Sequence, residues 1–91
     1  MPHQITVFIA GTSCMQCRLT ERYLASLDLA YDARPADELS DELREQAAAL
    51  GAAIQAPLVL VRDGAGALQQ AWGGYRPDLI DALVSERALA A

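Results

Sequence analysis

The sequence predicts an α/β protein in which helices cover both faces of one sheet, with elements in the order βαβαββα. Two observations support this fold class. Short apolar runs of strand length alternate with segments whose apolar residues recur at helical spacing, and turns containing glycine or proline separate them. The chain has no internal repeat and no low-complexity segment, so we expect residues 1–91 to form a single domain.

The first strand and the first helix are joined by a short turn. Residues 5–10 form an apolar run of strand length, and residues 11–13 form the turn. A helical pattern follows, with three leucines on one side: Leu19, Leu24 and Leu27. The two cysteines, Cys14 and Cys17, therefore open this helix.

A second strand and a second helix come next. Residues 29–33 alternate in the manner of a short, half-buried strand, and residues 35–37 mark its end. We expect the second helix over residues 38–50, with Gly51 stopping it. Its apolar residues fall on one face: Leu39, Leu43, Ala47 and Leu50.

The last three elements are a hairpin and a helix. Pro57 introduces the unbroken apolar run 58–61, which is typical of a strand covered on both faces. Residues 63–66 have turn chemistry, and residues 68–72 return as the second arm of the hairpin. After two glycines, Pro77 begins a helix whose apolar face carries Leu79, Ile80, Leu83 and Val84.

Composition and charge exclude several classes of function. With 53% apolar and 21% charged residues, the chain is globular rather than disordered. A net charge of −5 without a basic cluster argues against nucleic acid as a partner. The longest apolar stretch, residues 47–61, is interrupted and too short to span a bilayer. No Lys or Arg precedes Ile5, as a secretory signal would require, so we expect a cytoplasmic protein.

Cys14 and Cys17 are the only two cysteines, and their spacing and position favour thiol chemistry. The N–H groups of a first helical turn point toward the helix N-terminus, and the peptide dipoles add roughly half a positive charge there. Both effects favour a thiolate at Cys14. Residues three apart on a helix are neighbours, so Cys17 lies within disulfide reach as the less exposed partner.

Two other uses of the cysteine pair are weaker. A purely structural disulfide would close so short a loop that it restricts the unfolded chain by only about 2 kcal/mol. A zinc site needs three or four protein ligands. The one further soft ligand is His3, about 20 Å away at the far end of the first strand. We expect no zinc site within one chain, although two chains could share a metal.

Three motifs in this order resemble those of the NrdH redoxins, glutaredoxin-like proteins of the thioredoxin superfamily. The first two are Cys14-Met15-Gln16-Cys17 and Gln55-Ala56-Pro57-Leu58-Val59. The third, Trp72-Gly73-Gly74-Tyr75-Arg76-Pro77-Asp78, is similar to that family's Trp-Ser-Gly-Phe-Arg-Pro-Asp signature. The resemblance covers nearly the whole chain. Three positions or segments depart from the family pattern: Ala71 replaces a frequent histidine, Gly73 a serine, and residues 11–13 a Lys-Pro-Ser type of approach.

The resemblance implies a thioredoxin/glutaredoxin-like fold with a four-stranded mixed sheet, in which the three motifs converge on one surface. It implies a cis bond before Pro57, which leaves the backbone of Ala56 free to pair with an extended partner segment. It also implies that partner binding involves residues of the third motif: Trp72, Gly73, Gly74, Tyr75, Arg76 and Asp78.

The residue types alone leave these roles open. Trp72 fits a packed core as well as a docking surface, and Tyr75 fits either a buried position or an apolar docking patch. Arg76 could simply pair with Asp78 or Asp81 at the surface, which would contribute little to stability. In the family, its equivalent joins a hydrogen-bond network that holds this loop.

The resemblance also implies the activity, which is thiol-disulfide exchange without a bound cofactor. The Cys14 thiolate attacks a partner disulfide, and Cys17 resolves the mixed disulfide. Family likeness indicates thioredoxin reductase as the electron source and the large subunit of class Ib ribonucleotide reductase as the target. We expect the redoxin to be a monomer.

Three other functions stay open on the sequence. The first is a glutathione-dependent glutaredoxin. The second is a copper(I) carrier of the heavy-metal-associated type, because residues 11–17 fit Gly-x-x-Cys-x-x-Cys and two thiolates bind copper(I). Against it, that family has a βαββαβ order and usually a methionine where this chain has Thr12. The third is a redox-inert binding module with an incidental cysteine pair.

Overall fold

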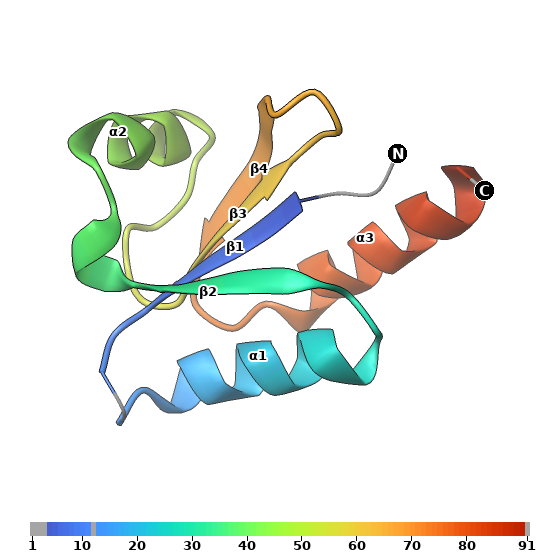
Figure 1. The fold of residues 1–91 in the computed structure, drawn as a ribbon, viewed down its shortest axis with the longest axis horizontal. Coiled ribbons are helices and arrows are strands. Elements are labelled where there is room, and N and C mark those ends of the chain that lie inside the picture. Colours follow the sequence, from blue (N-terminus) through green and yellow to red (C-terminus); the bar gives the residue numbers. More distant parts are fainter. Residues whose placement is uncertain (1–3, 12, 91) are drawn as a thin grey trace.

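The computed structural model describes residues 4–11 and 13–90, with side chains described up to residue 85. His3 and Thr12, which enter the expectations about metals, lie outside these ranges. The elements follow the predicted order, with one short 3-10 helix added (Figure 1): β1 (Gln4–Ile9), α1 (Met15–Ser26), β2 (Tyr31–Pro35), η1 (Ala36–Glu38), α2 (Asp41–Ala49), β3 (Leu58–Arg62), β4 (Leu68–Gly73) and α3 (Pro77–Ala90).

The four strands form one open mixed sheet in the order β2-β1-β3-β4. β1 runs parallel to β2, as a strand-helix-strand crossover requires, and antiparallel to β3, which forms a hairpin with β4. In Figure 1, α1 and α3 lie on one side of the sheet and α2 lies on the other. This is a thioredoxin-like fold, and it confirms the predicted fold class.

The larger apolar core lies between the sheet and the helices α1 and α3. Alternate residues of β1 and β3 point to this side, because successive side chains of a strand face opposite ways. The cluster consists of buried residues from six segments: Ile5, Val7, Leu24, Leu29, Val59, Val61, Trp72, Ile80 and Leu83. This core holds α1, the helix that begins at the cysteines, against the sheet.

A smaller apolar core lies on the α2 side of the sheet. It contains Phe8, Ala47, Leu58 and Leu60. β3 therefore contributes to both cores, which explains why its sequence is an unbroken apolar run rather than an alternating one.

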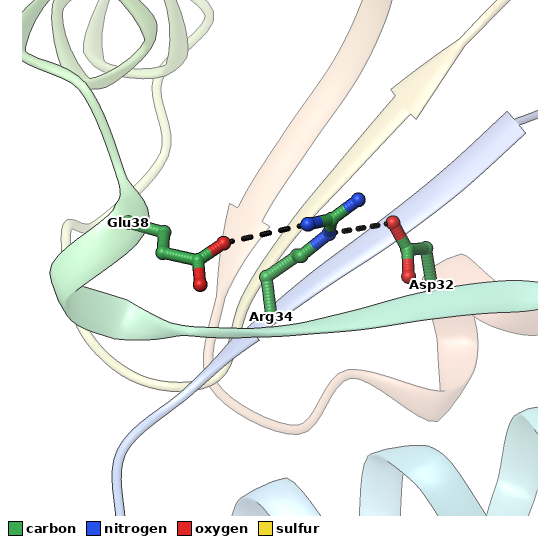
Figure 2. Close-up of polar contacts among 3 residues, drawn as sticks. All are labelled: Asp32, Arg34 and Glu38. Carbon is green, nitrogen blue, oxygen red and sulfur yellow. Dashed lines mark hydrogen bonds and ion pairs between the residues drawn. The ribbon is translucent and has the colours of Figure 1, made fainter.

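The edge strand β2 carries charge on the α2 side of the sheet. Asp32 and Arg34 stand opposite Thr6 and Phe8 of β1. Arg34 contacts Asp32 at 2.8 Å and Glu38 at 3.5 Å, as Figure 2 shows. All three side chains are more than half exposed, so the ion pairs add little to stability. Charge on an edge strand does, however, disfavour pairing with another chain.

The prediction that the second strand begins at residue 29 is wrong by two residues. Leu29 lies instead in the turn that follows α1. Its N–H donates to the Leu24 carbonyl at 3.0 Å, and the Asp28 N–H donates to the Ala25 carbonyl at 3.1 Å. Asp28 adopts a φ of 57°, the left-handed conformation of a Schellman ending. Leu29 is buried because this ending turns it into the larger core.

The predicted start of the second helix, residue 38, is also wrong. α2 begins after Ser40, whose side-chain oxygen accepts the Leu43 N–H at 3.1 Å as an N-cap. Leu39 precedes the helix and packs against the smaller core, whereas Leu50 is 48% exposed and does not share the buried face of Ala47. The predicted bounds of β1, β3 and β4 differ from the observed ones by at most one residue.

Within the described ranges, no helix combines the length and the apolar character needed to cross a membrane.

Candidate redox site

Cys14 and Cys17 lie at the start of α1, as predicted. Cys14 is the N-cap residue, with extended backbone angles, and its sulfur accepts the Cys17 N–H at 3.2 Å. The two residues form a disulfide, with 5.2 Å between their Cα atoms. The sequence places both sulfurs in the first turn of the helix, where free N–H groups gather.

The two cysteines differ in exposure. Cys14 is partly exposed, whereas Cys17 is one of the buried residues of α1 and is only 2% exposed. A partner sulfur can therefore approach Cys14 more easily than Cys17. This asymmetry suits a dithiol pair in which one cysteine exchanges with a partner and the other resolves the mixed disulfide.

The surroundings of Cys14 favour its thiolate form. The first turn of α1 contains no acidic residue, so nothing in that turn offsets the positive end of the helix dipole. The Cys17 N–H, which contacts the Cys14 sulfur in the disulfide, is a donor that a thiolate would also use. Both features stabilise negative charge on this sulfur after reduction.

The second motif contains a backbone segment without hydrogen-bond partners among the described residues. The Ala56–Pro57 peptide bond is cis, as the family resemblance implies. The carbonyl of buried Pro57 accepts the Gly74 N–H at 2.8 Å, whereas no backbone hydrogen bond joins Ala56 to another described residue. The Ala56 amide and carbonyl therefore remain unpaired within the described chain.

Clefts adjoin two of the three motifs. One of about 160 Å³ opens beside Ala56, and its lining includes Phe8, Ile54 and Arg44. Another of about 210 Å³ lies along α1 and includes Leu19 and Tyr75. Both have an apolar lining with one arginine, which suits contact with a partner protein rather than enclosure of a small molecule.

The third motif divides between core and surface. Trp72 is 4% exposed and belongs to the larger core, which favours the packing interpretation for its ring, and its Nε1 finds no partner among the described residues. Tyr75 is partly exposed and stands edge-to-face with Tyr23 of α1, with ring centroids 6.3 Å apart. Tyr75 is therefore the aromatic side chain of this motif that faces outward.

Arg76 and Asp78 form a surface pair. The guanidinium donates to both carboxylate oxygens, at 3.1 and 2.9 Å, and both side chains are more than half exposed. The hydrogen bond from Arg76 is the main reason that the pKa of Asp78 is lowered. The side-chain hydrogen bonds of Arg76 that the structure describes all go to Asp78, so this arginine does not tie the loop to another part of the chain.

Gln16 and Gln55, which the sequence does not mark for any role, join the three motifs. The Gln16 Oε1 atom accepts the Tyr75 N–H at 3.0 Å. Gln55 approaches Gly74 with its side-chain amide and Gly73 with its Cγ. Both glutamines lie within the sequence motifs, and this position is the only signal in the sequence that could have drawn attention to them. Their contacts are with residues far along the chain, which local patterns do not predict.

Tyr23 is a further residue that the sequence does not single out. Its hydroxyl donates to a carboxylate oxygen of Asp81, which links α1 to α3 beside Tyr75. That hydrogen bond is the main cause of the raised pKa of Tyr23. The contact fixes the ring against which Tyr75 rests.

The described residues contain no group of three or more His, Cys, Asp or Glu side chains that could hold a metal ion. The two cysteines alone do not make up the ligand set of a structural or catalytic zinc site. The observed order of helices and strands along the chain also differs from the βαββαβ order of the heavy-metal-associated copper carriers.

Compared with protein-family models and with curated proteins, the chain matches none of them. The assignment of a function to this chain therefore rests on its fold and on its cysteine pair. A Cys-x-x-Cys pair at disulfide distance, at the start of the first helix of a thioredoxin-like fold, is consistent with a thiol redox role.

Proposed function

We propose that this protein is a thiol-disulfide redoxin of the NrdH type. In this proposal it takes electrons from thioredoxin reductase in the cytoplasm and delivers them to the large subunit of a class Ib ribonucleotide reductase. The observation that carries the redox part is the pairing of a partly exposed Cys14 at the helix N-cap with a buried Cys17. The choice of partners is supported by the resemblance of the Trp72 to Asp78 segment to the signature of that family.

The reaction follows from the positions of the two sulfurs. The Cys14 thiolate attacks one sulfur of the partner disulfide, the partner S–S bond breaks, and the second partner sulfur leaves as a thiolate. Cys17 then loses its proton and attacks the Cys14 sulfur, which releases the first partner sulfur as a thiolate. Two electrons pass to the partner, and the redoxin is left as the Cys14–Cys17 disulfide.

The surface around Cys14 is suited to a protein partner. Met15, directly after the exposed cysteine, is 65% exposed, and Leu19 lies one turn further on the same side of α1. The free Ala56 backbone offers a donor and an acceptor to an extended segment of the partner. An apolar surface with an unpaired backbone segment suits a macromolecular disulfide better than a small thiol.

The test is a pair of coupled assays on the oxidised protein. One contains NADPH and thioredoxin reductase, the other contains NADPH, glutathione and glutathione reductase, and insulin is the disulfide substrate in both. We expect turnover with thioredoxin reductase and little with glutathione. Reduction by glutathione alone would overturn the NrdH assignment and leave a glutathione-dependent glutaredoxin.

Two serine variants test the roles of the cysteines. Cys14→Ser should abolish turnover, because the attacking sulfur is gone. Cys17→Ser should accumulate a mixed disulfide between Cys14 and the substrate, visible by mass spectrometry under non-reducing conditions. If Cys14→Ser keeps its activity toward disulfides, the pair is incidental. Stoichiometric tight copper(I) binding without disulfide reductase activity would favour a metal carrier instead.

A further inference from the structure

We infer that Gln16 is a positioning residue for partner docking, because its side chain holds the 72–78 segment against the start of α1. This inference deepens the proposed function and rests on it. Gln16 lies between the two cysteines, so it links the redox pair directly to the segment that we expect to contact the partner.

The link is a hydrogen bond across the fold. Gln16 and Tyr75 are 59 positions apart, and the Tyr75 N–H donates to the Gln16 Oε1 atom at 3.0 Å. Because an N–H requires an acceptor, this contact also fixes the orientation of the carboxamide, with its oxygen toward Tyr75. Among the described residues, this is the only hydrogen bond between residues 14–17 and residues 72–78.

Gly74 provides the room for this contact. Its φ of 87° lies in the region that favours glycine, and a Cβ atom added there would lie 3.2 Å from Gln16 Oε1 and 3.0 Å from Gln55 Nε2. The side-chain amides of both glutamines therefore approach the same small volume above Gly74. The Gly74 N–H is bonded to the Pro57 carbonyl, so the cis-proline loop meets the segment at this point too.

The hydrogen bond at Gln16 reaches the part of the 72–78 segment that faces outward. Tyr75 is the outward-facing aromatic residue of the segment, and its backbone amide is the group that Gln16 holds. The side chains of Arg76 and Asp78 hydrogen-bond to each other, and among the described residues no other side chain joins the segment to the cysteine motif by a hydrogen bond. Without Gln16, the Tyr75 N–H loses its acceptor, and the segment loses the one hydrogen bond that joins it to the cysteine motif among the described residues.

The experiment compares two variants with a matched control. Gln16→Leu removes the acceptor at nearly constant size, whereas Gln16→Glu keeps a carboxylate oxygen that can accept the Tyr75 N–H. The control is Gln69→Leu, since Gln69 donates to Asp63 at the other end of the hairpin. Each protein is measured for hydrogen exchange of the Tyr75 amide by NMR and for KM and kcat with insulin in the thioredoxin reductase assay.

We expect Gln16→Leu to speed exchange of the Tyr75 amide and to raise KM roughly threefold to tenfold, the size expected for the loss of one net hydrogen bond. Gln16→Glu should restore the amide protection, because its carboxylate oxygen can accept the Tyr75 N–H. Its KM is not the readout for this contact, since the new charge lies in the first turn of α1 beside Cys14. The Gln69→Leu control should match the unaltered protein in both measurements.

The outcomes separate this inference from the proposed function. If Gln16→Leu leaves Tyr75 exchange unchanged, or speeds exchange without raising KM, the positioning role is overturned while the redoxin assignment stands. A loss of Tyr75 amide protection that Gln16→Glu does not restore also overturns it. If the unaltered protein reduces no disulfide in either coupled assay, the proposed function fails and the inference fails with it.

Discussion

Gly73 offers a direct test of how the third motif packs, because the related signature has serine at this position. In the structure, a Cβ atom added to Gly73 would lie inside the contact distance of the Ala53 carbonyl oxygen. It would also lie 2.9 Å from the Gln55 Cγ atom and 3.0 Å from the Ala53 carbonyl carbon. We therefore expect Gly73→Ser, although it introduces the serine of the NrdH signature, to destabilise this protein.

The expected cost follows from what the new side chain meets. Two of its nearest atoms belong to backbone, and the Ala53 carbonyl oxygen also accepts the Gln55 N–H at 3.0 Å, so moving it away would break a further hydrogen bond. Overpacking of this kind costs about 1–3 kcal/mol. We expect a loss near the upper end, about 2–3 kcal/mol, which for a domain of this size lowers Tm by roughly 10–20 °C.

The measurement is urea unfolding followed by circular dichroism, with thermal unfolding as a second probe. Ala67→Ser is the control, because it adds the same hydroxyl at an exposed position of the hairpin and should change stability by about 0.5 kcal/mol or less. If Gly73→Ser unfolds within about 0.5 kcal/mol of the unaltered protein, the close approach of Ala53 does not limit this position, and the steric reasoning is refuted.

Two further predictions concern single residues outside the motifs. Asp28→Gly should raise the free energy of unfolding by about 0.5 kcal/mol, because glycine adopts the left-handed φ of the α1 ending more easily; unchanged urea unfolding would contradict this. The pKa of Asp63 is lowered from its ordinary value of 3.8, mainly by the hydrogen bond from the Ala67 N–H. The contribution of Asp63 to stability is therefore present above pH 3.8 and is lost as pH falls through the lowered pKa. The unaltered protein should therefore have a higher Tm than Asp63→Asn above about pH 4, and this difference in Tm should shrink at lower pH. A difference in Tm that stays constant down to about pH 2 would contradict the prediction.

Local patterns predicted the order of the elements because each was encoded within a few residues. The unbroken apolar run of β3 and the turn at residues 63–66 identify a buried hairpin. The placement of Cys14 and Cys17 at a helix start followed from the change of period between the first strand and the first helix. The boundaries failed at Leu29 and Ser40, where a helix ending and a cap decided which residues entered the next element.

The candidate site was predictable only in its covalent chemistry. The two cysteines indicated a thiol redox role, and the family resemblance drew attention to Ala56, Pro57 and the Trp72 to Asp78 segment. The residue types did not decide between burial and exposure within that segment. In the structure, Trp72 enters the larger core, Tyr75 faces outward against Tyr23, and Arg76 pairs only with Asp78 among its described side-chain contacts.

The sequence by itself determined that a dithiol pair opens a helix in an α/β protein, because spacing and periodicity are local properties of the chain. Only the tertiary structure decided the strand order, the burial of Trp72 and the contact between Gln16 and Tyr75. The physical reason is that these features depend on contacts between residues far apart in the chain. Such contacts exist only once both apolar cores have formed around the sheet.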